Sequence, residues 1–361
     1  MSRTWRMTTA LASAAALAAL WGCGGGGATS GSLQGFVKDA AGKPIAGCSV
    51  SALGATATTD GDGLYRLNDL PEATAVVSYR AAGYTPSVAR VPVAIGQTSQ
   101  WHPTLTVAQP ASAQATAATV SAGHDRGDGT GAGISLPASA LKTSAATVNV
   151  GITAVMPSDT GFAASAPGSA AGPARTALGR ACISITDPSG AAVALDASKT
   201  VSVTITLSAA GATGLTSAGL YHLDAATGVW SLVGTANRAP TGFAFDGSAP
   251  AATGWYELAV PAATPLTIQT LVVEEPSSMR PVIGATVRAQ SVSGSADVYA
   301  PTDAAGRAEL VVPSGDYKVT ASKLPPPYVY VQKGQLKRTT GSGTLQVTYW
   351  LQPQGGASGG N

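Results

Sequence analysis

Apolar and polar residues alternate with a period of two along much of this chain. In residues 201–208, four branched apolar side chains fall on one face and four hydroxyl-bearing side chains on the other. Val148, Val150 and Ile152 alternate with small or polar residues in the same way. Such alternation is typical of antiparallel strands that bury one face. We therefore predict an all-β protein built from tandem β-sandwich domains.

Helical signals are weak after the N-terminal segment. The Ala-rich run at residues 111–118 has helix propensity, but it lacks a large apolar face and is interrupted by Ser, Thr and Gln. We interpret it as part of a linker over residues 108–119. Pro and Gly together make up about a fifth of the chain, which favours turns over long helices. The Gly-rich end, residues 354–361, is predicted to be a disordered tail.

The N-terminus has the pattern of an export signal. Arg3 and Arg6 precede an uncharged, mainly apolar stretch at residues 7–21, which is shorter than a membrane-spanning helix. The tetrapeptide LWGC that ends at Cys23 resembles the bacterial lipobox, in which the Cys is acylated and becomes the mature N-terminus. The sequence therefore predicts a lipoprotein signal peptide over residues 1–22, cleaved before a lipidated Cys23. An ordinary signal-peptidase cut in the Ala-rich run is the alternative.

Charge and composition indicate which partners the mature protein has and how it is attached to a membrane. Residues 23–32 are rich in Gly and Ser, and we interpret them as a flexible tether. The net charge is only +2, and the clustered Lys and Arg that bind nucleic acid are missing, so nucleic acid is excluded as a partner. We expect a lipid anchor in the cell envelope. Gly24, rather than Asp, after the Cys favours the outer membrane, with a periplasmic or surface-facing body.

Two parts of the chain repeat each other. The segment KPIAGCSVSA at residues 43–52 and the segment RPVIGATVRA at 280–289 share a basic residue, Pro, a branched apolar residue, Gly, Val and Ala at equal spacing. Residues 59–67 and 302–310 both begin Thr-Asp, with a Gly four residues after the Thr. Each copy is expected to form a strand, a turn that needs Gly, and a return strand. The repeat predicts two related domains, at residues 33–107 and 266–353.

The repeated blocks resemble the carboxypeptidase regulatory-like domain, a transthyretin-like (prealbumin-like) sandwich with the runs G-x-P-[IV]-x-G-x-x-V and T-D-x-x-G-x-[YF]. The first copy carries both runs, whereas the second has Ala308 at the aromatic position. The region between them, residues 120–262, resembles the β-rich region beside such a repeat in cartilage intermediate layer proteins, through GISLPASAL at 133–141 and GLYHLDAATGVW at 219–230. These resemblances imply an extracellular scaffold or matrix-type role and name no catalytic residue.

The sequence offers no recognisable catalytic constellation. A zinc carboxypeptidase needs two His and a Glu on one metal, but His102, His124 and His222 all lack a partner at His-x-x-Glu spacing. The serine-hydrolase pattern G-x-S-x-G occurs at residues 356–360, in the predicted tail and without a following helix. We therefore predict a protein that is not an enzyme, with no catalytic residue, metal or cofactor.

Two short motifs suggest ligands but have simpler interpretations. Asp60 and Asp62 lie in a DGDG run that is similar to the start of a calcium loop. The repeat has Asp-Ala-Ala-Gly at residues 303–306, without the second carboxylate, so we interpret both runs as turns. Arg126 and Asp128 belong to an Arg-Gly-Asp tripeptide, the integrin-binding motif, which the Gly-rich composition of this stretch explains by chance.

Two cysteines remain after Cys23. Export places Cys48 and Cys182 in an oxidising compartment, where one disulfide would be possible. They fall in different predicted domains, so we expect two separate thiols, the first on an apolar strand face and the second on a more polar one.

Aromatic residues are the candidates for a binding face. Tyr328 and Tyr330 follow three prolines and flank one residue, so both rings are expected on the same face of a stiff, extended segment. They could stack on sugar rings, or pack across strands in the core. Trp101 and Trp350, near the ends of the two copies, are expected to be core or closing residues, and His222 a packed or half-exposed strand residue. We predict a binding module for a polysaccharide or a cell-surface protein. The alternative is a structural or adhesive envelope scaffold without a small ligand.

Overall fold

The computed structural model describes residues 29–159, 162, 175–262, 265–274, 280–292, 297–323, 330–331, 335–337 and 343–351. The predicted signal peptide, the lipidation site at Cys23 and the predicted tail lie outside these ranges. The described part consists of strands, turns and one short 3-10 turn, Ala138–Ala140, which confirms the predicted all-β class. None of its helical segments has the length and apolar character needed to cross a membrane.

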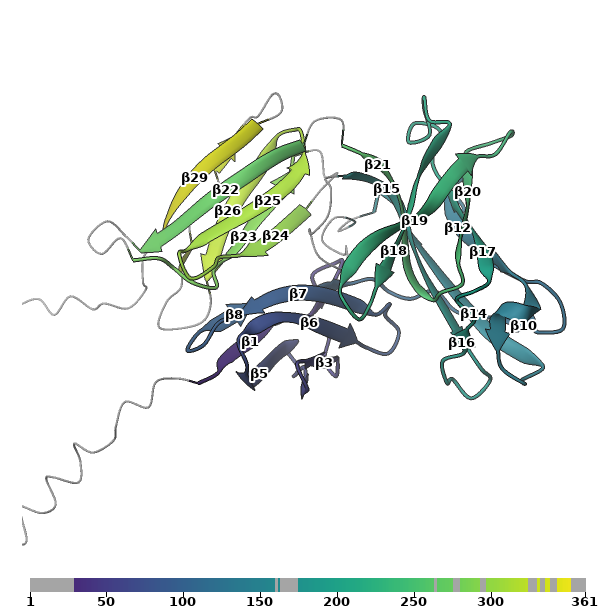
Figure 1. Cartoon of the computed structure of the whole chain (residues 1–361), viewed down its shortest axis with the longest axis horizontal. Helices are drawn as coiled ribbons and strands as arrows, with labels where there is room; N and C mark the ends of the chain where they lie inside the picture. Colours follow the sequence, from purple (N-terminus) through teal and green to yellow (C-terminus); the bar gives the residue numbers. More distant parts are fainter. Residues whose placement is uncertain are drawn as a thin grey trace, which may run out of the picture.

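The N-terminal sandwich packs a sheet of order β5-β1-β8 against a sheet of order β4-β3-β6-β7 (Figure 1). β1 pairs antiparallel with β5 and parallel with β8. Its core includes Tyr65 and Tyr79, whose hydroxyls lie 2.9 Å apart. Its strands are β1 (Gly31–Phe36), β2 (Lys38–Asp39), β3 (Ser49–Ala52), β4 (Ala55–Thr58), β5 (Leu64–Leu70), β6 (Ala73–Arg80), β7 (Ser87–Val93), β8 (Thr98–Gln100) and β9 (Thr104–Leu105).

The C-terminal sandwich has the same arrangement. A sheet of order β25-β22-β29 lies against one of order β24-β23-β26-β27, and β28 also pairs with β26. β22 is antiparallel to β25 and parallel to β29, as β1 is to β5 and β8. The sequence repeat therefore corresponds to a repeat of topology. The strands are β22 (Pro265–Glu274), β23 (Thr286–Ser291), β24 (Asp297–Pro301), β25 (Arg307–Pro313), β26 (Tyr317–Lys323), β27 (Tyr330–Val331), β28 (Gln335–Lys337) and β29 (Gly343–Leu351).

The Thr of each Thr-Asp block fastens two segments inside its sandwich. Thr59 Oγ1 donates to the Ile45 carbonyl at 2.6 Å and accepts the Cys48 N–H at 2.8 Å. Thr302 makes the equivalent pair of hydrogen bonds, at 2.6 and 2.9 Å. Both hydroxyls are buried, and a buried polar group needs such partners. This explains why Thr occurs at the same place in the two copies.

The Asp that follows the Thr closes a turn in each copy. Asp60 Oδ1 accepts the N–H groups of Asp62 and Leu64 at 3.0 and 2.9 Å, and Asp303 Oδ1 does the same at 2.8 and 2.9 Å. Gly63 then adopts φ +75°, and a Cβ there would lie 2.5 Å from the Val37 carbonyl oxygen. These hydrogen bonds support the interpretation of the DGDG run as a turn.

The missing aromatic of the second copy is replaced from another strand. Ala308 pairs with Thr270 where Tyr65 pairs with Gly35 in the first copy. Tyr349, which comes from β29, is fully buried, and its hydroxyl donates to the Val319 carbonyl at 2.8 Å. The core of the C-terminal sandwich therefore keeps a large ring from a different position.

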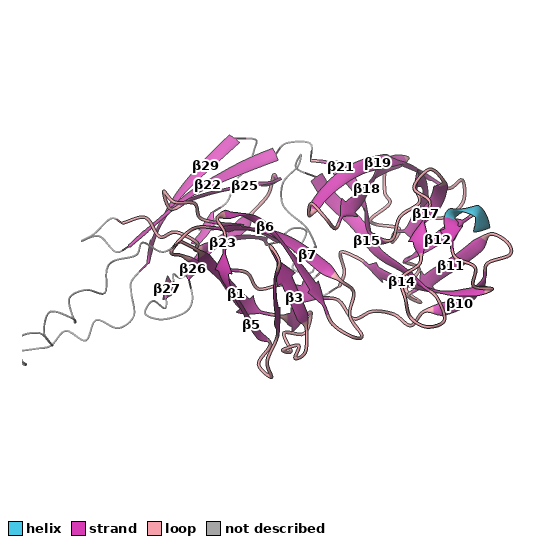
Figure 2. Ribbon diagram, turned by 60° about the horizontal axis from the view of Figure 1, so that its bottom comes forward, coloured by secondary structure: helices cyan, strands magenta, loops and turns pink. Residues whose placement is uncertain are grey.

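The central domain is one ten-stranded sheet that curls around its core, instead of two separate sheets (Figure 2). Its two end regions meet where His124 of β11 accepts the Ala154 N–H of β14 through Nδ1 at 3.0 Å. Its strands, including the small β13–β16 pair, are β10 (Ser112–Ala115), β11 (Val120–Asp125), β12 (Gly131–Leu136), β13 (Leu141–Lys142), β14 (Thr147–Val155), β15 (Arg175–Thr186), β16 (Ala194–Leu195), β17 (Thr200–Thr206), β18 (Ser217–Asp224), β19 (Val229–Arg238), β20 (Ala244–Pro250) and β21 (Gly254–Pro261).

Four sequence-based expectations need correction. The predicted linker contains β10, which pairs with β14 as an edge strand, where small residues suffice. The predicted tether reaches into β1, which begins at Gly31. Trp350 is 39% exposed instead of buried in a core, because its position on β29 alternates with that of the inward-facing Tyr349. Cys182 is buried because another domain covers its face of the sheet.

That covered face forms the contact between the N-terminal sandwich and the central domain. A separate apolar cluster joins Val88 of β7 to Cys182, Trp230 and Trp255 of the central sheet. The indole Nε1 of Trp255 donates to the Pro86 carbonyl at 2.7 Å. The two domains therefore share a packed, hydrogen-bonded interface.

A buried ion triad lies beside this cluster. The Glu257 carboxylate accepts Arg175 Nε at 2.5 Å and Arg180 Nε at 2.7 Å. Arg180 also donates to the Phe162 carbonyl, and Arg175 stacks over the ring of Tyr221 at 4.9 Å. Burial alone would raise the pKa of Glu257, but the charges of Arg180 and Arg175 outweigh it and lower this pKa below its usual value.

The two sandwiches also touch each other. Thr286, the first residue of β23, donates from its hydroxyl to the Gln100 carbonyl of β8 at 3.2 Å. Gly284 lies so close to the same strand that a Cβ would be 3.3 Å from the Thr98 carbonyl oxygen. The edge of the first sandwich at β8 is therefore covered by the second sandwich.

Candidate functional site

The residues predicted from the sequence as sites fall mostly outside the described structure. Cys23 and Tyr328 lie outside it. Tyr330 begins β27 and pairs with Lys323 of β26, but its side chain is not among those described. The aromatic platform and the lipidation site therefore stay predictions.

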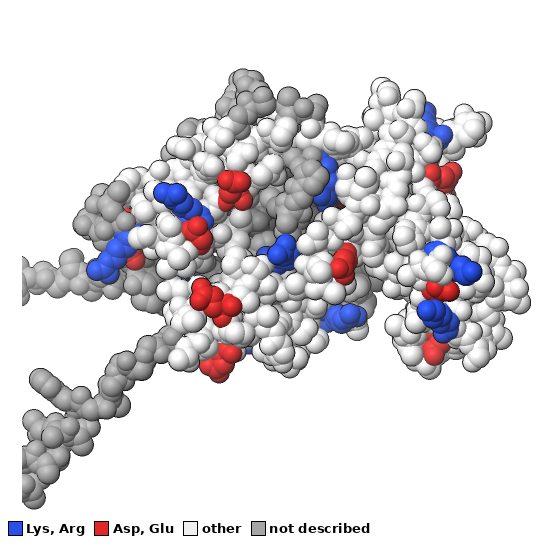
Figure 3. All heavy atoms as spheres, viewed as in Figure 1, with Lys and Arg blue, Asp and Glu red and all other residues white. Residues whose placement is uncertain are grey.

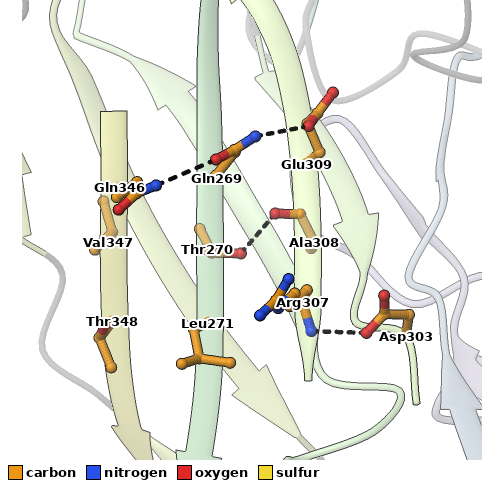
Figure 4. A pocket seen from close by; sticks show the side chains of 10 residues that line it. All are labelled: Gln269, Thr270, Leu271, Asp303, Arg307, Ala308, Glu309, Gln346, Val347 and Thr348. Atoms are coloured by element: carbon orange, nitrogen blue, oxygen red, sulfur yellow. Dashed lines mark hydrogen bonds between the residues drawn. The ribbon is translucent and has the colours of Figure 1, made fainter. Parts of the chain in front are cut away.

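A different surface stands out on the C-terminal sandwich. The outer side of the sheet β25-β22-β29 forms a shallow hollow of about 470 Å³ (Figure 4). We call the polar side chains that line it the polar outer face: Gln269, Arg307, Glu309, Gln346 and Thr348. All five residues are exposed.

The strand period places these residues on one side. In β22, Ile268 and Thr270 point into the core, so Gln269 between them points outward. The register sets Gln269 between Glu309 of β25 and Gln346 of β29. Three side chains from three strands therefore stand in one row.

Hydrogen bonds order this row. Gln269 Nε2 donates to Glu309 Oε2 at 3.1 Å, and Gln346 Nε2 donates to Gln269 Oε1 at 3.5 Å (Figure 4). Each amide donates to the next residue of the row, so the chain of hydrogen bonds ends at the carboxylate of Glu309, which only accepts. The row presents fixed donors and acceptors to a partner.

The next row of the face adds an apolar position and a cation. Arg307, Leu271 and Thr348 are cross-strand neighbours. Arg307 is placed by the Asp303 turn, because its own N–H donates to Asp303 Oδ1 at 2.9 Å. Trp350, two residues after Thr348 in β29, is the next residue on the same side and is 39% exposed. A guanidinium, a carboxylate, two amides and a hydroxyl thus share one surface.

This set of groups suits binding and lacks a nucleophile with a base. Within the described ranges no three or more His, Cys, Asp or Glu residues come together in a way that would hold a metal ion. Acidic and basic residues are sparse and interspersed over the surface seen in Figure 3, so this side of the molecule has no large patch of one charge sign. The polar outer face offers hydrogen-bond donors and acceptors together with one positive and one negative charge.

Two of the histidines have structural roles. His102 Nδ1 accepts the Phe36 N–H at 3.1 Å, and burial, helped by the charge of Lys38, lowers the pKa of His102 to about 4. His222 is half-buried in β18, and its Nε2 lies 3.0 Å from the Thr253 carbonyl oxygen. The interpretation of His222 as a packed or half-exposed strand residue is confirmed.

In the Arg-Gly-Asp tripeptide the arginine is held by the fold, whereas Gly127 and Asp128 are exposed. Both terminal nitrogens of Arg126 pair with the carboxylate of Asp159, and its side chain is 18% exposed. The hydrogen bonds that Arg126 donates to Asp159, opposed by partial burial, raise the pKa of Arg126. The guanidinium therefore serves the fold.

Both described cysteines are free and buried. Burial raises the pKa of Cys48, and it raises the pKa of Cys182 to about 12. Neither thiol is poised to act as a nucleophile. The sequence contains no local signal for the burial of Cys182, because Arg180 and Ser184 on the same strand face are polar.

Sequence reasoning also missed the polar outer face. The repeat held a signal: the pattern Thr-x-Gln occurs at residues 98–100 and again at 344–346. These short runs are too weak to be noticed without the register that aligns them.

Comparison with known proteins identifies one of the domains. Residues 32–106 match the carboxypeptidase regulatory-like domain, as the motifs of the first copy indicated. No curated protein matches the chain. The match covers the N-terminal sandwich, while the second sandwich shares its topology and its buried Thr contacts.

Solved structures give only distant likenesses. The Bacillus anthracis TIE protein has 15% identity, with 91% of this chain and 51% of that chain covered and a TM-score of 0.23. The chain thus spans about half the length of that protein. The major pilin subunit BcpA of Bacillus cereus has 10% identity, coverage of 90% and 99%, and a TM-score of 0.20. The major pilin SpaD of Corynebacterium diphtheriae has 11% identity, coverage of 90% and 98%, and a TM-score of 0.20.

Proposed function

We propose that this chain is an exported, non-catalytic protein of the cell envelope with a structural or adhesive role, which binds its partner through the polar outer face. The observation that carries the proposal is the ordered row Gln346–Gln269–Glu309 on an exposed sheet, with two more polar groups and no catalytic pair beside it. Binding sites fix their ligands with a few well-placed polar groups of this kind.

The contacts between domains support the structural part of the proposal. The apolar cluster around Trp255 and its hydrogen bond to Pro86 hold two domains together, and the buried triad at Glu257 joins β15 to β21 inside the central domain. The contact of Thr286 with Gln100 adds the third. Three domains joined in this way can display the face at the far end of the tether from a membrane. The lipid at Cys23 would supply the attachment, with the protein in the outer membrane.

Bead-based binding tests the proposal. Purified protein is coupled to beads and offered a panel of neutral polysaccharides and, separately, a labelled sample of the same protein. We expect the beads to retain at least one of these, and the double substitution Gln269→Ala and Gln346→Ala to reduce retention at least tenfold. Asn237→Ala, a polar change in β19 of the central domain, is the matched control. Absence of any retention, or equal retention by the Gln variant, would contradict the proposed role of this face.

A further inference from the structure

The contact between the two sandwiches is made from elements that both of them possess. On one side stands the edge strand with the pattern Thr-x-Gln, residues 98–100 in β8. On the other side stands the pattern Gly-x-Thr, residues 284–286, at the start of β23. Each pattern has a counterpart in the other copy.

The counterparts follow from the register. Gln100 pairs with Gln34 of β1, and Gln346 pairs with Gln269 of β22. Each central Gln lies three residues before the Val whose N–H donates to the Gly of the Thr-Asp turn, at 2.8 Å in both copies. Residues 344–346 are therefore the second copy of residues 98–100. In the same way Gly47 and Ser49 match Gly284 and Thr286.

Burial differs between the copies in a consistent way. Gln34 and Gln100 are 5% and 1% exposed, whereas Gln269 and Gln346 are exposed. On the other side, Thr286 is buried at 6%, whereas Ser49 is exposed. A Cβ on Gly284 would meet the Thr98 carbonyl oxygen at 3.3 Å, but one on Gly47 would have no heavy atom within 4 Å. In each molecule, therefore, residues 98–100 and 284–286 form the contact and are its used halves. The equivalent residues 344–346 and 47–49 do not take part in such a contact within the described structure and are its unused halves.

The unused halves lie on different sides of the molecule. β29 lies along the outer edge of the C-terminal sandwich, and β3, which begins at Ser49, lies on the far side of the N-terminal sandwich (Figure 1). Figure 2 shows the same separation from a second direction. A contact between two unlike surfaces on opposite sides is heterologous, and it propagates from one copy to the next.

We propose that the partner of the polar outer face is a second copy of this chain. The Gly47–Ser49 segment of one molecule docks on the Thr344–Gln346 edge of the next and repeats the contact that Gly284 and Thr286 make with β8. This assignment rests on the proposed function, because it names the occupant of the same face. The product is an open head-to-tail chain of molecules.

The strength of the contact depends on tethering. Inside the chain the two sandwiches are held at an effective concentration of the order of mM, which a dilute solution does not supply. Between molecules the same contact is therefore weak in solution and favoured where a lipid anchor crowds the copies on a membrane. Self-association is therefore tested at protein concentrations up to about 1 mM, the order of the effective concentration inside the chain.

The test is sedimentation velocity over this range, on protein carrying Cys23→Ala so that lipid-driven micelles do not contribute. Ser49→Arg blocks the docking segment, and Thr344→Arg blocks the edge. We expect the parent to form dimers, trimers and longer species as its concentration rises, and each variant alone to stay monomeric. Ser202→Arg, which changes an exposed hydroxyl-bearing strand residue of the central domain, is the matched control and should behave like the parent.

Mixing the two blocked variants gives the sharpest outcome. One still offers its edge and the other its docking segment, so the mixture should form dimers that grow no further. Recovery of dimers also shows that both variants are folded. A parent that is monomeric up to about 1 mM, a symmetric dimer that stops growing, or variants that assemble like the parent would overturn the proposal. If polysaccharide is retained on beads while the parent stays monomeric, the proposed function stands and this inference fails.

Discussion

The buried triad at Glu257 allows a quantitative test of what stabilises the central domain. Glu257→Gln keeps the shape of the side chain but removes its charge. The side chains of Arg175, Arg180 and Glu257 are 13%, 8% and 3% exposed, so the substitution leaves two guanidinium groups in a buried place without an anion. Breaking a buried ion pair from one side costs about 3 to 5 kcal/mol, and we expect a loss of this size in the unfolding free energy at pH 7.

The same triad predicts how the loss of unfolding free energy in Glu257→Gln depends on pH. The arginines lower the pKa of Glu257 in the folded protein. A carboxyl with a depressed folded pKa stabilises the fold above its unfolded pKa of about 4.3, and the stabilisation is lost as pH falls through the folded value. The difference between parent and Glu257→Gln should therefore be largest near neutral pH and shrink in acid.

Urea unfolding followed by tryptophan fluorescence measures this difference, because the guanidinium of Arg175 lies 5.6 Å from the ring of Trp230. Glu309→Gln is the matched control, since Glu309 is an exposed carboxylate that should contribute less than about 1 kcal/mol. Equal losses in the two variants, or a Glu257→Gln loss that is unchanged from neutral to acidic pH, would refute the reasoning.

Three further predictions concern single contacts. Trp255→Phe removes the hydrogen bond to the Pro86 carbonyl and should cost about 1 kcal/mol and speed proteolysis between the two domains, which limited digestion would show. In a Cys23→Ala background, the buried thiols of Cys48 and Cys182, with raised pKa values, should not react with a thiol reagent until the protein is denatured, and fast native labelling would contradict their burial. Thr302→Val leaves the Ala285 N–H and the Val282 carbonyl without their partner and should lower the unfolding free energy by about 2 to 4 kcal/mol, whereas a neutral effect in thermal melts would remove the proposed role of the hydroxyl.

How well the sequence predicted each element depends on how many faces it buries. β17 buries one face, so its alternation was clear from the residues alone. β14 is buried on both faces over most of its length. Its alternating pattern therefore predicts only one of its two buried faces. β10 carries little apolar surface, so its composition predicts a linker; its pairing with β14 is a backbone property that side-chain patterns do not report.

The site was harder to predict than the fold. The repeat of Thr-Asp and Gly blocks followed from local turn chemistry, which a sequence displays directly. The contacts of Trp255 with Pro86 and of Thr286 with Gln100 join residues 169 and 186 positions apart, and nothing local encodes them. The polar outer face depends in the same way on the register of three strands that are distant in sequence.

Hydrogen–deuterium exchange tests most directly whether the polar outer face is the binding surface. Dilute and concentrated samples of the protein are compared, with exchange followed by peptide. Binding of a copy through this face should slow exchange in β29, at Gly343–Leu351, and around Gly47 and Ser49, and leave the central sheet unchanged. Exchange at β29 that stays equally fast at every concentration, or protection that appears on the central sheet instead, would contradict the account.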